Sequence, residues 1–164
     1  MTRWLAWRLR RCGLAIGFAA LTLPCPVFAA LGGDAASVQA DSVHMQASLR
    51  TSQAATTQGG AYTLHELHSS SGVVVREYVS SAGAVFGVAW QGPWLPDLHQ
   101  LLGTYFEPYV QAMQARNAGR AGRRPVHIEI PGLVVNLSGH PRSFTGQAYI
   151  PENLPQGMKA EDVR

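Results

Sequence analysis

Three short runs of β-forming residues follow one another, and they constrain the fold of this chain more than any other feature. The runs are Ala61–His68, Val73–Ser80 and Ala84–Gln91, separated only by Ser69–Gly72 and Ser81–Gly83. Such short connections suit hairpins, whereas a parallel pair needs a crossover of a dozen residues or more. The sequence therefore predicts a three-stranded antiparallel meander.

Alternation within these runs predicts which side chains share a face of the sheet. Tyr62 and Leu64 fall on one face of the first strand. Phe86, Val88 and Trp90 fall on one face of the third strand, and we expect that face to lie in the core.

A helical stripe follows the meander. Pro96 and Asp97 predict a helix start, and Pro108 lies inside the pattern, so we expect a kink there or a restart near Glu107. The apolar residues recur at spacings of three and four: Leu98, Leu101, Leu102, Tyr105, Tyr109 and Met113.

The flanking segments complete an α+β prediction. Asp34 predicts the N-cap of a helix that runs toward Leu49, and Thr51–Gly60 has the small, polar composition of a linker. Later strands are expected at Val126–Ile130, Leu133–Ser138 and Phe144–Ile150. We therefore expect an antiparallel sheet, formed by the meander and two or three later strands, packed against one long helix, with an N-terminal helix.

The first 29 residues have the composition of a secretory signal peptide. Arg3, Arg8, Arg10 and Arg11 precede an apolar run at Cys12–Leu23, which is too short to span a membrane. Small side chains at Val27 and Ala29 predict cleavage between Ala29 and Ala30. We expect a periplasmic or secreted protein that meets the membrane only transiently, with one domain over residues 30–150 and an irregular tail over residues 151–164.

Two features of the N-terminus bear on the route of export. Arg10-Arg11 resembles a twin-arginine signal, but the residues that follow match that pattern poorly. Cys25 is a candidate for lipidation, although Pro24 just before it fits a lipoprotein signal badly.

Cleavage would change both the cysteine content and the charge. Cys12 and Cys25 are the two cysteines, so the mature chain would have neither a disulfide nor a thiol nucleophile. Removing four arginines leaves nine basic and ten acidic residues, which gives no reason to expect nucleic-acid binding.

Several segments together resemble a family of small exported bacterial proteins of unknown function, number 2844 among the catalogued domains of unknown function. The resemblance implies export and carries over no activity and no catalytic residue. It rests on Leu31–Gly33, Tyr62–Leu67, Val75–Val79, Val85–Pro93, Leu95–Leu98, Phe144–Pro151 and Leu154–Gly157.

The histidines give no metal motif. His65 and His68 are one residue short of the zincin spacing, and on a strand they point to opposite faces. His127 or His140 joining one of them across the fold cannot be read from spacing. We therefore predict no catalytic, metal-binding or cofactor-binding residue, and no cofactor.

The other candidate chemistries are equally sparse. Ser138 and His140 lack a nucleophile elbow, and a triad is recognised only by geometry. Arg116, Arg120, Arg123 and Arg124 form one basic cluster, read either as a solvated loop or as a contact for an anionic partner.

Trp94 lies between Pro93 and Pro96, in a corner that joins the third strand to the long helix. Either it plugs this corner against the sheet, so that Trp94→Ala would cost about 3–5 kcal/mol, or it stays exposed and anchors a partner. The first use is the expected one.

Three functions remain open. The leading hypothesis is a non-enzymatic binding or accessory module. The sequence does not identify its partner, for which another exported or envelope protein is the candidate. The alternatives are an enzyme that uses His65, His68 or His140, and a structural envelope component that assembles through its sheet edges.

Overall fold

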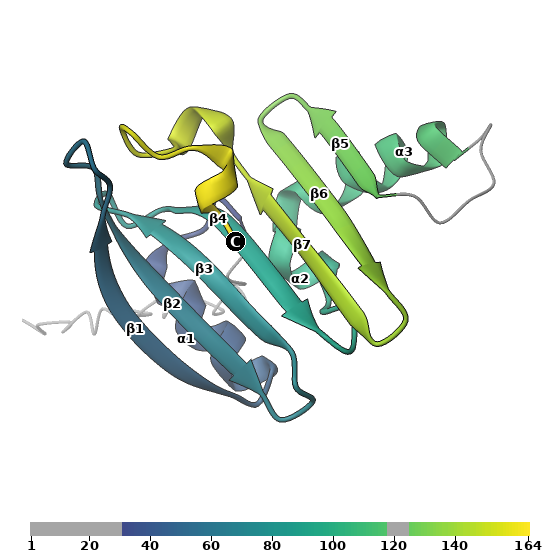
Figure 1. The fold of residues 1–164 in the computed structure, drawn as a ribbon, viewed down its shortest axis with the longest axis horizontal. Coiled ribbons are helices and arrows are strands. Elements are labelled where there is room, and N and C mark those ends of the chain that lie inside the picture. Colours follow the sequence, from purple (N-terminus) through teal and green to yellow (C-terminus); the bar gives the residue numbers. More distant parts are fainter. Residues whose placement is uncertain (1–30, 118–124) are drawn as a thin grey trace, which may run out of the picture.

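The computed structural model describes residues 31–117 and 125–164, and these form an α+β fold around one antiparallel sheet. The sheet has seven strands in the order β1-β2-β3-β4-β7-β6-β5 (Figure 1). The strands are β1 (Ala47–Ala55), β2 (Ala61–Ser69), β3 (Val74–Ser80), β4 (Val85–Gly92), β5 (Val126–Ile130), β6 (Leu133–His140) and β7 (Ser143–Tyr149). The helices are α1 (Ala35–His44), α2 (Leu98–Leu102) and α3 (Phe106–Asn117).

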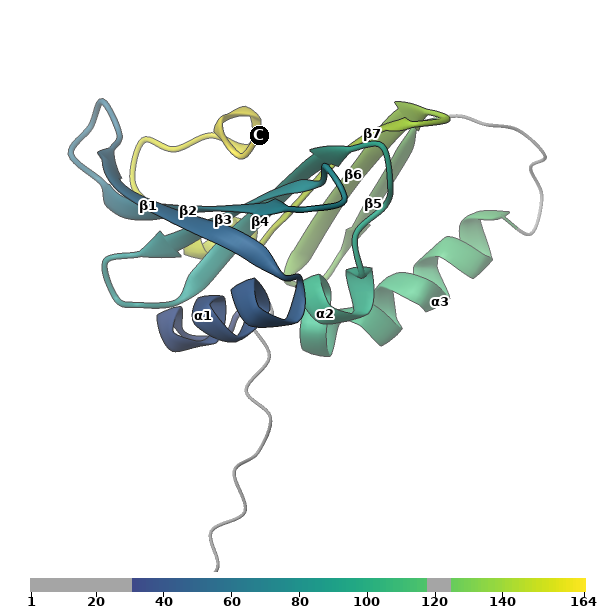
Figure 2. The same ribbon diagram turned by 90° about the horizontal axis from the view of Figure 1, so that it is seen from below.

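The sheet separates two hydrophobic cores. All three α-helices cover one face, and the C-terminal tail crosses the other (Figure 2). The larger core lies under the helices and contains Val75, Val88 and Leu101, whereas the smaller core lies under the tail and contains Tyr78 and Phe86. The central strands are therefore buried on both faces. Among the described residues, no helix is long and apolar enough to cross a membrane.

The segment before the predicted meander contains an additional strand. Asp34 caps α1 as predicted, with its Oδ1 accepting a hydrogen bond of 3.0 Å from the N–H of Ser37. The helix ends at His44 rather than continuing toward Leu49, and the predicted linker is wrong because Ala47–Ala55 forms β1. This strand pairs along its whole length with β2, which makes the meander four-stranded. Small polar residues have low intrinsic β-propensity, so the sequence of β1 does not predict a strand. The strand is stabilised by its pairing with β2.

Phe86 is the exception to the predicted facing of β4. Tyr78 pairs with Gly87 and Val79 pairs with Val85, so Phe86 is the extra residue of a β-bulge. A bulge reverses the alternation beyond it, and Phe86 therefore packs in the smaller core while Val88 and Trp90 pack in the larger one. Trp90 is in the core, as predicted.

The long helix is interrupted before Pro108. Gly103, with a positive φ of 51°, ends α2, and one turn of 3₁₀-helix leads into α3 at Phe106. Pro108 is then the third residue of α3, where its missing N–H has no intrahelical partner to lose. The predicted restart near Glu107 is confirmed, and the preceding helix ends at Gly103, not at the proline.

The three later strands appear within a few residues of the predicted bounds. The tail forms two single 3₁₀ turns, Pro151–Asn153 and Ala160–Asp162, and packs against the sheet. Val163 is fully buried over Gly87, and the backbone of Arg164 is held at both ends by the Tyr78 hydroxyl, which donates to its carbonyl and accepts from its N–H. The tail is thus the cover of the smaller core.

Truncating Val163 tests the role of the tail. Because its side chain is completely buried, Val163→Ala should lower the free energy of unfolding by about 1–3 kcal/mol. Urea denaturation would measure the change. Glu161→Ala is the control within the same tail, since Glu161 forms only an exposed ion pair with Lys159 and should change stability by less than about 0.5 kcal/mol. Equal midpoints for wild type and Val163→Ala would contradict a structural role.

Candidate functional site

Several of the predicted site residues lie outside the described residues. The predicted cleavage site at Ala29 and Ala30 is one of these, and so are Arg120, Arg123 and Arg124 of the basic cluster. Arg116, the remaining member, donates a hydrogen bond of 2.9 Å from Nη2 to the carbonyl of Pro125. This bond ties the last turn of α3 to the start of β5.

Trp94 does not plug the corner between β4 and α2. Its side chain is 58% exposed, and the neighbouring Leu95 is 46% exposed. The predicted burial is therefore wrong: the larger core includes Trp90 before the corner and Leu98 after it, but not Trp94. The corner itself is fixed by the prolines and by Asp97, whose carboxylate accepts from the N–H groups of His99 and Gln100. Trp94 is thus a large exposed ring on a restrained backbone.

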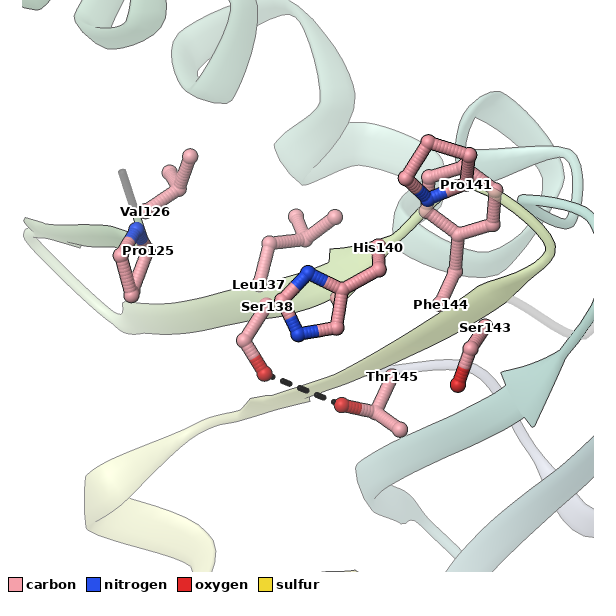
Figure 3. A pocket seen from close by; sticks show the side chains of 10 residues that line it. Pro125, Val126, Leu137, Ser138, His140, Pro141, Ser143, Phe144 and Thr145 are labelled. Atoms are coloured by element: carbon pink, nitrogen blue, oxygen red, sulfur yellow. Dashed lines mark hydrogen bonds between the residues drawn. The ribbon is translucent and has the colours of Figure 1, made fainter. Parts of the chain in front are cut away.

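A surface hollow lies at the same end of the sheet. The last residue of β4, Gly92, pairs with Phe144, and Phe144 lines a hollow of about 780 Å³ around the turn between β6 and β7 (Figure 3). Among the residues that the structure describes, the lining contains neither an acidic nor a basic side chain other than histidine. It consists of Pro125, Val126, Leu137, Ser138, Gly139, His140, Pro141, Ser143, Phe144 and Thr145.

The polar groups of this hollow do not form a catalytic triad. Ser138 Oγ and Thr145 Oγ1 are 3.0 Å apart and hydrogen-bonded across β6 and β7. His140 lies on the same face of β6 as Ser138, but the lining offers no carboxylate to orient its imidazole. The hollow can therefore accept uncharged groups, with apolar rings from Pro141 and Phe144 and hydrogen bonds from hydroxyls and imidazole.

The two β2 histidines point to opposite faces of the sheet, as predicted. His65 is hydrogen-bonded through Nδ1 to Thr51 Oγ1 at 2.9 Å, and partial burial lowers the pKa of its imidazole. His68 Nε2 lies 3.9 Å from Glu66 Oε2 on the other face. In the described part of the chain, no group of three or more histidine, aspartate or glutamate side chains is placed to hold a metal ion.

Arg76 and Glu77 are adjacent in β3 but lie in two different electrostatic environments. Arg76 lies on the face that the C-terminal tail crosses, where its Nε donates to Glu66 Oε1 at 2.7 Å. That hydrogen bond and the charge of Arg76 lower the pKa of Glu66. Glu77 lies on the opposite face, fully buried under the helices.

Glu77 forms a buried carboxyl pair with Asp41 of α1, and this pair was not predicted. Asp41 is only 1% exposed, and its Oδ1 accepts a hydrogen bond from Nε2 of the buried Gln100 of α2. Burial, and after it the charge and hydrogen bond of Asp41, together raise the pKa of Glu77 to about 9. One signal was present in the sequence: strand alternation puts Glu77 on the same face as Val75 and Val79.

The buried pair joins three elements rather than forming an accessible site. Asp41 comes from α1, Glu77 from β3 and Gln100 from α2. Neither carboxyl reaches solvent, so no substrate contacts them. A protonated Glu77 is neutral and places no second negative charge next to Asp41. The two carboxyl groups can therefore be buried side by side without repelling each other.

Comparison with protein-family models identifies the family of this chain. A model described as a protein of unknown function, DUF2844, matches residues 27–163. The chain belongs to this family. The match includes the tail that covers the smaller core of this DUF2844 protein, and it assigns no activity. No curated protein and no solved structure matches the chain.

The pH dependence of stability tests the buried pair. The unfolded chain releases the Glu77 proton near pH 4.5, whereas the folded chain keeps it up to about pH 9. The unfolded state therefore binds fewer protons in this window, and the contribution of Glu77 to stability falls as the pH rises from 4.5 to 9, by at most about 1.4 kcal/mol per unit. Glu77→Gln keeps a donor for Asp41 and should remove this slope.

The measurement is urea denaturation of wild type and variant at intervals from pH 5 to 9. The stability of Glu77→Gln relative to wild type should rise steadily across the range. Glu66→Gln is the control: since the pKa of Glu66 is lowered, its difference from wild type should stay flat above pH 5. A flat difference for Glu77→Gln as well would mean that Glu77 is ionised in the folded state.

Proposed function

We propose that this protein is an exported, non-enzymatic binding or accessory module whose contact surface is the Trp94 corner and the adjoining hollow. The observation that carries the proposal is the exposure of Trp94. Tryptophan is enriched among residues that dominate binding energy. Pro93 and Pro96 restrict the backbone on either side, so holding the ring in place for a partner costs little further entropy.

The surroundings of Trp94 favour a partner with an apolar, uncharged contact. Leu95 extends the exposed apolar area, and the hollow near Phe144 offers hydroxyl and imidazole groups without charge. Interfaces are depleted of charge at their centres, and the exposed Trp94 and Leu95 would suit such a centre. Another exported or envelope protein is the proposed partner.

The proposal of export rests on the N-terminal sequence. A basic segment, a short apolar run and small residues at Val27 and Ala29 have the order that signal peptidase requires. The membrane is then met only during passage, and the periplasm or the extracellular medium is the proposed location.

Substitution of Trp94 tests the contact surface. Trp94→Ala should leave the unfolding midpoint close to wild type, with a change below about 0.5 kcal/mol, because the ring is mostly in solvent. A photo-crosslinking residue at position 94 should capture a defined exported protein in cells. Binding of that purified protein should weaken by about 30-fold or more in Trp94→Ala, the loss expected of a hot-spot tryptophan.

Val43 provides a matched control. It is 71% exposed and apolar but lies on α1. Val43→Ala should leave binding unchanged, and a crosslinker at position 43 should not capture the same protein. Equal capture at both positions, or a loss of several kcal/mol of stability in Trp94→Ala, would refute Trp94 as an anchor.

Intact-mass measurement tests export. Protein recovered from the envelope or medium should have the mass of a chain that begins at Ala30. Retention of residues 1–29, or a diacylglyceryl adduct on Cys25, would overturn the predicted processing.

A further inference from the structure

Strand β1 is one edge of the sheet, and the described residues place no element beside its outer side (Figure 1). It is nine residues long and pairs with β2 at every position. Residues Arg50, Thr51, Ser52 and Gln53, in the middle of the strand, are all exposed. The outer backbone groups of an edge strand are unpaired and form a template for another strand.

The hydrogen-bond pattern shows which residues carry those outer groups. The N–H of Thr56 donates to the carbonyl of Gly60, so hydrogen-bonded pairs fall at the even positions of β1. The N–H of Ser69 at the far end of β2 donates to Val73 and not to β1, which agrees with this assignment. The outward-facing backbone groups of β1 therefore belong to Ala47, Leu49, Thr51, Gln53 and Ala55.

The usual protections against edge pairing are missing from β1. The strand has no proline and no bulge. Its single charged residue, Arg50, lies opposite Glu66 of β2. The other edge strand, β5, differs: it has five residues and directly follows Pro125. Short strands and prolines are devices that keep edges from pairing.

We propose that two copies of this chain pair through β1, antiparallel and about a two-fold axis at Thr51, to form one continuous sheet. This register brings all nine residues of each strand into the pair. It sets Leu49 opposite Gln53 and Thr51 opposite its own counterpart, so each outward residue exchanges two backbone hydrogen bonds. Threonine pairs across strands are favourable, and the remaining contacts involve small residues such as Ser48 and Ala54.

Of the two neighbouring registers, the one with its axis at Ser52 would pair only residues 49–55 of each strand, and charge excludes the other. A two-fold axis at Arg50 would also align the outward backbone groups, but it would set Arg50 directly opposite Arg50 of the second copy, which is repulsive. The axis at Thr51 places Arg50 opposite Ser52 instead. The pairing is independent of the proposed Trp94 contact, because Trp94 follows β4, and β2 and β3 separate that strand from β1.

Proline at position 53 tests the backbone pairing. The Gln53 N–H points outward, so Gln53→Pro removes a donor from the proposed interface while leaving the β1–β2 hydrogen bonds in place. Light scattering of the purified chain should show one chain mass at low concentration and two at high concentration. Gln53→Pro should remain monomeric at all concentrations, and Gln53→Ala, which keeps the N–H, should dimerise like wild type.

Charge at position 52 tests the register without altering the backbone. Ser52→Glu places a carboxylate opposite Arg50 twice in the dimer and should tighten it by about two- to thirtyfold. Ser52→Lys should weaken it by a similar factor. A chain that stays monomeric at about millimolar concentration overturns the proposal, even if β1 captures an extended segment of a different protein. The proposal is also overturned by a dimer whose affinity is unchanged by Gln53→Pro, by Ser52→Glu and by Ser52→Lys.

Discussion

Burial of the central strands on both faces is the constraint on which the rest of this structure depends. Helices cover one face of β3 and β4, and the C-terminal tail covers the other. A strand with two covered faces cannot alternate between apolar and polar residues, and β4 is indeed buried at six consecutive positions. The bulge at Phe86 distributes these side chains between the two cores, and Gly87 leaves the space that Val163 of the tail occupies.

The same constraint explains the buried carboxyl pair. A position of β3 that faces the helices has no route to water, so an acid there must give up its charge or find partners. Glu77 does both, because burial favours its protonated form and Asp41 lies against it. Gln100 then connects Asp41 to α2. One polar cluster thus joins α1, β3 and α2.

The two surfaces proposed for recognition lie at the periphery, since the helices and the tail occupy the centre of both faces. The corner after β4 presents Trp94 on a backbone restrained by two prolines. The hollow around the β6–β7 turn lies at the same end of the sheet. The outer edge of β1 presents backbone groups instead of side chains. The two surfaces would select different partners: the first through shape and apolar contact, the second through strand pairing and the position of Arg50.

Local patterns in the sequence determined the hairpins of the meander, the cap at Asp34, the restart of the helix near Glu107 and the opposite facing of Arg76 and Glu77. Each depends on residues close in the chain: turn length, a side-chain oxygen at a helix start, a proline, or alternation. Tertiary structure alone decided the rest. β1 forms because β2 pairs with it, and Asp41 meets Glu77 because α1 packs over the sheet. The core takes in Trp90 and Leu98 and leaves Trp94 in solvent. These outcomes depend on contacts between distant segments, for which space in the core and access to water are settled only when the whole chain has packed.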